Sequence, residues 1–204
     1  MKEGCRALEA EKFSVIVLAG GQSRRMGQDK ASLSWGEKDV LSSLLARLLP
    51  LSDDVVVISN VERTVTSPVR QFPDLIPGKG PLSGIHAGLI HARHDLVFVT
   101  ACDVPFLIPE IIPHIVHSIG SKDGSVAIYN EQVEPLFACY HKHCSGIVAE
   151  LLAKEKYRVK DFLTRISWVG VQDLKQYADC CFMNINTPHE YEKAKAILAE
   201  GREV

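Results

Sequence analysis

Short apolar runs alternate with polar, glycine- and proline-rich stretches along the chain. Three of these runs have the composition of strands buried on both faces: residues 13–19 (FSVIVLA), 55–59 (VVVIS) and 95–100 (DLVFVT). Shorter strands are expected over 125–128, 136–140 and 167–171. Apolar residues at helical spacing predict helices over 41–49, 83–93, 108–119, 145–154, 160–166 and 189–200.

Strands and helices therefore alternate, which predicts parallel β–α–β units and a three-layer α/β domain. We expect residues 1–12 to form a polar leader and residues 13–204 to form a single domain. Residues 68–81 contain four prolines and two glycines, so this stretch is expected to be mostly loop. Ser83 is expected to cap the helix that follows the loop.

The composition is that of a folded globular protein, and it narrows the class of partner. The 204 residues are 46% apolar and 24% charged, and 23 basic against 25 acidic residues give a net charge of −2. This balance gives no electrostatic case for nucleic acid or an anionic membrane as the main partner. No apolar run approaches the ~18–20 residues of a membrane span. The acidic N-terminal segment lacks a signal-peptide pattern, so we expect a cytoplasmic protein.

The six cysteines, at positions 5, 102, 139, 144, 180 and 181, lack paired CxxC spacing, so we expect buried or half-buried thiols. Cys139, His141, His143 and Cys144 form a cluster of metal-ligand types. Alternate positions of a strand face the same side, which suggests a site, but no second cluster completes the ligand set. We therefore favour ordinary core and surface roles for these four residues over structural zinc.

The segment after the first predicted strand carries the clearest chemistry. It reads LAGGQSRRMGQDK over residues 18–30, and ligands of open α/β sheets bind at the carboxyl ends of the strands. Gly20 and Gly21 let main-chain N–H groups approach an anion, and Arg24, Arg25 and Lys30 add positive charge. The loop is a candidate phosphate cradle, with a spacing that is neither a Walker P-loop nor GxGxxG. The alternative is an exposed loop with solvated basic residues.

The same segment resembles the signature of the molybdenum cofactor guanylyltransferases, a family of the nucleotidyltransferase superfamily. Further segments are similar to that family, in order and at family-like spacing: Asp74 with GPLSGI over 80–85, CDVPF over 102–106, PLFA over 135–138 and NINTP over 184–188. The resemblance runs from Val15 to about Tyr191. It implies an α/β fold, namely a three-layer αβα Rossmann-like nucleotidyltransferase fold with a mostly parallel central sheet.

The resemblance also implies a reaction, in which GMP passes from GTP to the terminal phosphate of molybdopterin or molybdenum-molybdopterin and pyrophosphate leaves. Mg²⁺ is the implied cofactor, and GTP, the pterin and other molybdenum cofactor pathway proteins are the implied partners. The implied catalytic residues are Lys30, Arg25 and Asp103, with Asp103 as metal ligand. The implied GTP-binding residues are Leu18, Ala19, Gly20, Gly21, Lys30, Asn60, Asp74 and Asp103. The candidates for the pterin side or a second metal ligand are Asn184, Asn186 and Arg158.

Elementary chemistry supports some of these roles and leaves alternatives open. Asp103 follows the third strand at the edge that holds the loop, where a carboxylate can hold Mg²⁺ against a triphosphate. The alternative for Asp103 is a turn-forming aspartate.

Two other functions of the protein also stay open. One is a related nucleotidyltransferase with another nucleotide or acceptor, such as cytidylyl transfer to molybdopterin or transfer to a sugar or polyol phosphate. The other is a non-catalytic adapter that binds nucleotide or pterin.

Overall fold

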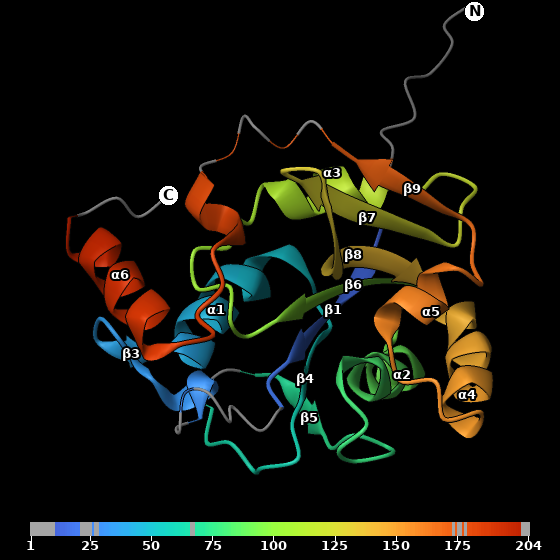
Figure 1. The fold of residues 1–204 in the computed structure, drawn as a ribbon, viewed down its shortest axis with the longest axis horizontal. Helices are drawn as coiled ribbons and strands as arrows, with labels where there is room; N and C mark the ends of the chain where they lie inside the picture. Colours follow the sequence, from blue (N-terminus) through green and yellow to red (C-terminus); the bar gives the residue numbers. More distant parts are fainter. Residues whose placement is uncertain are drawn as a thin grey trace, which may run out of the picture.

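The computed structural model describes residues 11–20, 26, 29–65, 68–172, 174, 177 and 179–200, and the structural statements below concern these residues. Their centre is a seven-stranded sheet in the order β5–β4–β1–β6–β8–β7–β9 (Figure 1). The strands are β1 (Phe13–Leu18), β4 (Val55–Ile58), β5 (Arg70–Phe72), β6 (Leu96–Ala101), β7 (Gly124–Tyr129), β8 (Gln132–His141) and β9 (Trp168–Val171). β8 pairs antiparallel with β6 and β7, and the other neighbours pair parallel, so the sheet is mostly parallel as expected.

Helices cover both faces of this sheet (Figure 1). They are α1 (Val40–Leu48), α2 (Pro81–His91), α3 (Ile111–His117), α4 (Ser145–Ala153), α5 (Val159–Leu163) and α6 (Pro188–Ala199). Residues of α1 and α3 pack with Val15 and Val17 of β1, whereas residues of α2, α4 and α5 pack with Ile16 and Leu18. Because side chains alternate along a strand, this division builds one apolar core on each face. The result is the expected three-layer αβα arrangement.

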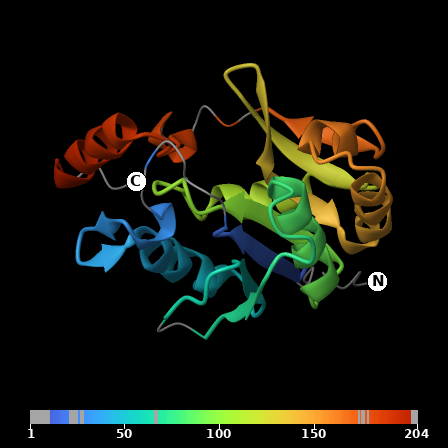
Figure 2. The same ribbon diagram turned by 60° about the horizontal axis from the view of Figure 1, so that its bottom comes forward.

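A smaller core joins α6 to a hairpin of β2 (Ser34–Trp35) and β3 (Lys38–Asp39), which the sequence analysis missed. Two-residue strands are too short to show an alternating pattern. Trp35, Phe106, Ile185 and Ala194 are buried in this core. Figure 2 shows α6 beside the hairpin and away from α4 and α5. Ile185 thereby anchors the segment between α6 and the short helix η4 (Asp179–Phe182).

One local expectation needs correction. α2 begins at Pro81 and not at Ser83, because the fixed φ and missing N–H of proline suit the first helical position. Ser83 is buried, and its hydroxyl donates to the carbonyl of Ile76 at 2.7 Å, which ties the preceding loop to the helix. The stretch 68–81 is mostly loop, as expected, and it includes the short edge strand β5, where Arg70 pairs with the buried carboxylate of Asp54.

The thiols that the structure describes lie where the sequence predicts them. Cys102, Cys139, Cys144 and Cys181 are buried and Cys180 is half-buried, whereas Cys5 lies outside the described residues. Burial raises the pKa of the Cys139 thiol to about 12, so this thiol stays protonated.

The N-terminal division and the location of the protein stay predictions. Residues 1–10 of the expected leader over 1–12 lie outside the described residues, so the single domain over 13–204 is untested at this boundary. Among the described residues, no helix has both the length and the apolar character to cross a membrane.

Candidate active site

Three neighbouring parallel strands end at one edge of the sheet. The register pairs Leu18 of β1 with Ile58 of β4 and with Ala101 of β6. The residues that follow the strands are therefore neighbours in space, and they include three candidate site residues, Gly20, Asn60 and Asp103. This is the edge at which open α/β sheets bind ligands.

Gly20 is exposed and lies against the end of β4. A Cβ added to Gly20 would lie 3.8 Å from the carbonyl oxygen of Ile58 and from Cα of Ser59, which is ordinary contact. Packing within the protein therefore does not demand a glycine, and its bare main chain can be approached closely by a ligand. The other expected parts of the phosphate cradle, Gly21, Arg24 and Arg25, lie outside the described residues.

Arg63, which the sequence analysis missed, joins both ends of the candidate phosphate loop. Its guanidinium donates to the carbonyl of Ala19 at 2.6 Å, to the hydroxyl of Ser59 at 3.0 Å, and to the carboxylate oxygens of Asp29 at 2.6 and 3.1 Å. Partial burial acts to raise the pKa of Asp29, but the hydrogen bonds and charge of Arg63 outweigh it and hold that pKa below its usual value. Asp29 is therefore ionised, and it caps the short helix η1 (Lys30–Ser32) that begins with Lys30.

Lys30, Asp103 and Asn186 converge from three distant parts of the chain. The Nζ of Lys30 lies 3.1 Å from Oδ2 of Asp103 and also donates to Oδ1 of Asn186. The side chains of Lys30 and Asp103 are mostly buried, with 15% and 21% of their surface exposed. The main chain adds a second link, because the N–H of Ile185 donates to the carbonyl of Asp103 at 2.9 Å. A cation therefore already stands against the carboxylate that the resemblance assigns to Mg²⁺.

The segment that carries Asn186 is held in place by the start of α6. Thr187 caps this helix, and its hydroxyl accepts from the N–H of Glu190 at 3.2 Å. The carboxylate of Glu190 in turn accepts from the N–H of Asn186 at 2.8 Å and from the hydroxyl of Thr187 at 3.0 Å. This reciprocal arrangement is close to a capping box, and it has Pro188 at the first helical position. It fixes the main chain beside Lys30 and Asp103.

Asn60 and Asp74 hold one another on the other side of β1. The amide of Asn60 donates to Oδ2 of Asp74 at 2.9 Å, and the N–H of Asp74 donates back to Oδ1 of Asn60 at 2.9 Å. Gly84 of α2 makes room for them, since a Cβ there would lie 3.4 Å from Oδ1 of Asp74 and 3.0 Å from Cδ2 of Leu18. These four residues thus form one packed group next to Gly20.

A pocket of about 320 Å³ opens between the end of β6 and β8. Its walls are mainly apolar, and its polar side chains are Asp103, Glu134, Asn184 and Asn186. A volume of ~300–1,000 Å³ with a few polar groups is typical of small-molecule sites. Burial raises the pKa of Glu134, and the negative charge of Asp103 adds to this effect. The sequence analysis missed Glu134, although it directly precedes the PLFA segment.

This end of the sheet thus brings together two neighbouring groups of candidate residues, with Lys30 and Asp103 between them. Residues 15–169 match the family model described as a MobA-like NTP transferase domain. The chain belongs to the MobA-like NTP transferase family. The resemblance expected from the sequence is confirmed.

Relatives and solved structures agree with this family. Relatives from Pelotomaculum thermopropionicum and Carboxydothermus hydrogenoformans are 37% and 31% identical to this MobA-like transferase. The alignments cover 92% and 93% of this chain and 94% and 98% of the relatives, and both relatives bear the name "Probable molybdenum cofactor guanylyltransferase". The crystal structure of molybdopterin-guanine dinucleotide biosynthesis protein A from Archaeoglobus fulgidus is 25% identical, with a TM-score of 0.80 over 92% of this chain and 99% of that chain. The expected fold class is therefore confirmed.

A more distant solved structure marks how far the fold alone extends. The 2-C-methyl-D-erythritol 4-phosphate cytidylyltransferase from Thermus thermophilus is 15% identical to this MobA-like transferase, with a TM-score of 0.68 over 91% of this chain and 98% of that chain. At this identity, the likeness shows a shared fold and gives no information about the substrate.

The described site residues of this MobA-like transferase form two groups with a shared centre, but their roles stay predictions. The first group comprises Leu18, Ala19, Gly20, Asn60 and Asp74. The centre and the pocket comprise Lys30, Asp103, Asn184 and Asn186. Arg158 is exposed at the start of α5 and precedes Val159, which lines the pocket. Arg158 makes no ion pair with the residues that the structure describes.

The four residues of the cysteine–histidine cluster do not converge on one point. Cys139 packs in the core with α1 and α3, whereas Cys144 packs in the core on the other face of the sheet. The ring of His141 stacks on that of His143, with 5.1 Å between the ring centres. A four-ligand site made of these residues is therefore excluded by their placement.

Proposed function

We propose that this MobA-like transferase moves GMP from GTP to the terminal phosphate of molybdopterin, or of its molybdenum-loaded form, and releases pyrophosphate. The names of the relatives support this reaction. At the level of the site, the observation that carries it is the convergence of Lys30 with Asp103 and Asn186 between two binding regions. The cytoplasm as location and other pathway proteins as partners belong to the same proposal.

GTP would bind on the side of β1 and β4. The glycine-rich main chain after β1 would face the phosphates, and the pair of Asn60 and Asp74 would face the base. Asn60 engages one carboxylate oxygen of Asp74, which leaves the other oxygen for a donor on the ligand. The N1–H and N2–H₂ groups of guanine are two adjacent donors, whereas the same edge of cytosine has one donor group, N4–H₂, beside the acceptors N3 and O2. This arrangement supports guanine as the base.

Mg²⁺ fits the donor set around Asp103. This ion prefers oxygen ligands and is usually held by one or two carboxylates together with waters and substrate phosphates. Asp103 supplies a carboxylate, and Asn184 and Asn186 supply amide oxygens from the segment that Ile185 ties to Asp103. When bound, the ion would neutralise part of the charge on the triphosphate. Lys30 adds a positive charge beside it.

The pterin would occupy the pocket between β6 and β8. Its flat ring suits the apolar walls, which include Leu136, Phe137 and Phe182. The amino and ring N–H groups of a pterin are donors, and the half-buried carboxylate of Glu134 in the lining is an acceptor for them. Arg158, at the start of α5, would meet the phosphate of the pterin.

The transfer depends on positioning and charge stabilisation. A phosphate monoester has a second pKa of about 6, so the acceptor phosphate carries a negative oxygen near neutral pH and needs no general base. That oxygen attacks the α-phosphorus of GTP, the bond from the α-phosphorus to the bridging oxygen breaks, and pyrophosphate leaves with the electron pair. Lys30 and the main-chain N–H groups of the loop would stabilise the charge on the phosphates.

The proposal is tested with the purified chain, molybdopterin, Mg²⁺ and each of GTP, CTP, ATP and UTP. We expect pyrophosphate and a guanine dinucleotide with GTP alone. Asp103→Asn should lose the transfer, whereas Asp95→Asn should keep it. Asp95 is a matched control, because it is exposed and precedes the same strand that Asp103 follows.

The alternatives are distinct outcomes of this experiment. Turnover with CTP in place of GTP would assign a cytidylyltransferase and overturn the proposal. Binding of GTP without pyrophosphate release at any pterin concentration would assign a non-catalytic adapter. Turnover with a sugar or polyol phosphate, and none with molybdopterin, would assign another acceptor.

A further inference from the structure

A second cluster of ligand-type side chains lies at the opposite edge of the sheet from the candidate active site. Asp123 directly precedes β7, and His143 and Cys144 belong to the short helix η3 (Lys142–Cys144) that follows β8. The last residue of β8, His141, pairs with Leu96, the first residue of β6. Asp103 follows the other end of β6, which is ~17 Å away at about 3.3 Å per residue. The cluster is therefore separate from the transfer site.

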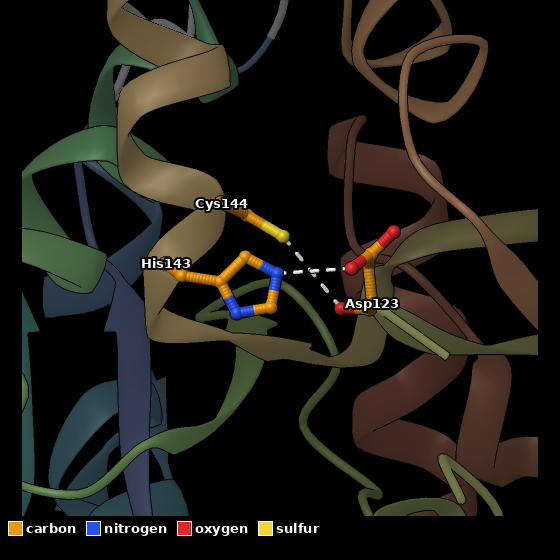
Figure 3. Close-up of side chains that lie close together, drawn as sticks. All are labelled: Asp123, His143 and Cys144. Atoms are coloured by element: carbon orange, nitrogen blue, oxygen red, sulfur yellow. Dashed lines mark hydrogen bonds and ion pairs between the residues drawn. The ribbon is translucent and has the colours of Figure 1, made fainter. Parts of the chain in front are cut away.

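The three side chains converge on one point (Figure 3). Nε2 of His143 lies 2.9 Å from Oδ1 of Asp123, and Sγ of Cys144 lies 3.7 Å from the carbonyl oxygen of Asp123. One ligand atom from each of the three residues lies within 4.8 Å of the others. Around a tetrahedral zinc ion, with bonds of about 2.0–2.3 Å, neighbouring ligand atoms stand roughly 3.3–3.8 Å apart. A contraction of about 1 Å at the widest pair would therefore complete the geometry.

Ser167 holds the carboxylate oxygen of Asp123 that does not contact His143. The N–H and the hydroxyl of Ser167 both donate to Oδ2 of Asp123 at 2.8 Å, which leaves Oδ1 facing His143. The main chains of Asp123 and Ser167 are also joined, because the N–H of Asp123 donates to the carbonyl of Ser167 at 2.8 Å. Metal-binding carboxylates typically have such outer hydrogen bonds, which fix the orientation of the ligand.

We propose that Asp123, His143 and Cys144 bind one Zn²⁺ ion, with a water molecule in the fourth position. A set of one oxygen, one nitrogen and one sulfur suits zinc, whereas Mg²⁺ and Ca²⁺ prefer oxygen alone. His143 is 61% exposed, so the ion can enter from solvent and a water can complete its coordination. Cys144 gives up its thiol proton to solvent as the sulfur–zinc bond forms.

The bound ion would join the turn before β7 to the start of α4. Cys144 directly precedes α4 and packs in the core between that helix and the sheet. A ligand that binds the folded chain and not the unfolded chain stabilises the fold in proportion to its concentration. The ion would therefore stabilise the fold, and its binding does not depend on the proposed transfer reaction.

The test uses the untagged full chain after treatment with a chelator. We expect one Zn²⁺ per chain by calorimetry and a rise in Tm with zinc. Co²⁺ in place of zinc should give the near-ultraviolet charge-transfer band of a thiolate ligand. His143→Ala should lower the zinc affinity by more than about 10-fold, since mutation of a residue that only hydrogen-bonds to a metal ligand already lowers metal affinity by about that factor. His117→Ala, at an exposed histidine of α3, should leave it unchanged.

Several results would overturn the proposal. These are the absence of stoichiometric binding, an unchanged affinity in His143→Ala, and a cobalt complex without the thiolate band. Cys144 is buried, so Cys144→Ala tests the source of the band in whatever fraction folds, and a band that persists there assigns the metal to another thiol. Absence of zinc binding would leave Asp123 and His143 as a hydrogen-bonded pair and would have no bearing on guanylyl transfer.

Discussion

Replacement of Arg63 by alanine removes the guanidinium that joins Ala19, Ser59 and Asp29 beneath the candidate phosphate loop. A hydrogen bond with a charged partner contributes about 1.5–3 kcal/mol, and a buried polar group that loses its partner costs about 1–3 kcal/mol. The side chain of Arg63 is 8% exposed and that of Asp29 is 44% exposed, so water can replace much of the lost contact at Asp29. We therefore expect the free energy of unfolding to fall by about 2–4 kcal/mol.

Urea and thermal unfolding measure this loss. For a chain of this size, 1 kcal/mol lowers Tm by about 2–4 °C, so Tm should fall by roughly 4–16 °C. Arg165→Ala is the control, because its ion pair with Glu150 is exposed on both sides and should contribute less than about 1 kcal/mol. A loss in Arg63→Ala no larger than that in Arg165→Ala would refute the reasoning.

The pH dependence gives a second reading of the same contact. Asp29 has a pKa below the ordinary 3.8 in the folded chain, so its contribution to stability is present above pH 3.8 and is lost as the pH falls through the lowered value. The difference in the free energy of unfolding between the wild type and Arg63→Ala should therefore narrow below pH 3.8.

The KM for GTP should also rise in Arg63→Ala, because the ends of the loop lose their link. Arg63→Lys should restore little of the stability or of the GTP affinity, since lysine cannot reproduce the planar fork of the guanidinium.

Two further substitutions separate the nucleotide side from the pterin side. Lys30→Ala should lower turnover about 10²-fold or more, as expected for a charge that acts on the phosphates. The control Lys38→Ala, on the exposed hairpin, should leave turnover unchanged. Equal kcat/KM values in the two variants would contradict the role of Lys30. Glu134→Gln should raise the KM for the pterin several-fold and leave the KM for GTP unchanged, with Glu131→Gln at the exposed turn as control. Because the pKa of Glu134 is raised above 4.5, its carboxylate is protonated at a higher pH than that of an ordinary glutamate, so pterin binding should begin to weaken at that higher pH as the pH falls. A pH profile of pterin binding that is the same in Glu134→Gln would contradict the assignment.

The apolar runs were enough to predict which residues meet in one half of the candidate site. β1, β4 and β6 are short, β-branched and buried, and parallel strands end at the same edge of a sheet. Gly20, Asn60 and Asp103 follow these three strands, so their proximity could be inferred from the order of the elements alone.

The position of Asn186 could not be inferred in this way. Asn186 lies in a segment that belongs to no strand, and its place depends on two tertiary contacts of Ile185: the burial of its side chain beside α6 and its hydrogen bond to the carbonyl of Asp103. Arg63 was missed for a similar reason. A single arginine in a loop has no periodic pattern, and its contacts with Ala19 and Asp29 appear only when β1 and β4 are side by side.

Glu134 was missed because of the direction of one strand. The alternation of strands and helices favours parallel pairing, and a parallel β8 would have placed its first residues at the edge far from Asp103. β8 instead runs antiparallel, with Phe137 beside Thr100 near the end of β6, so the residues just before Phe137 reach the edge where Asp103 lies. The same reversal carries the end of β8, and with it His143, to the opposite edge beside Asp123. One antiparallel strand thus accounts both for the carboxylate in the proposed pterin pocket and for the distance between that pocket and the proposed zinc site.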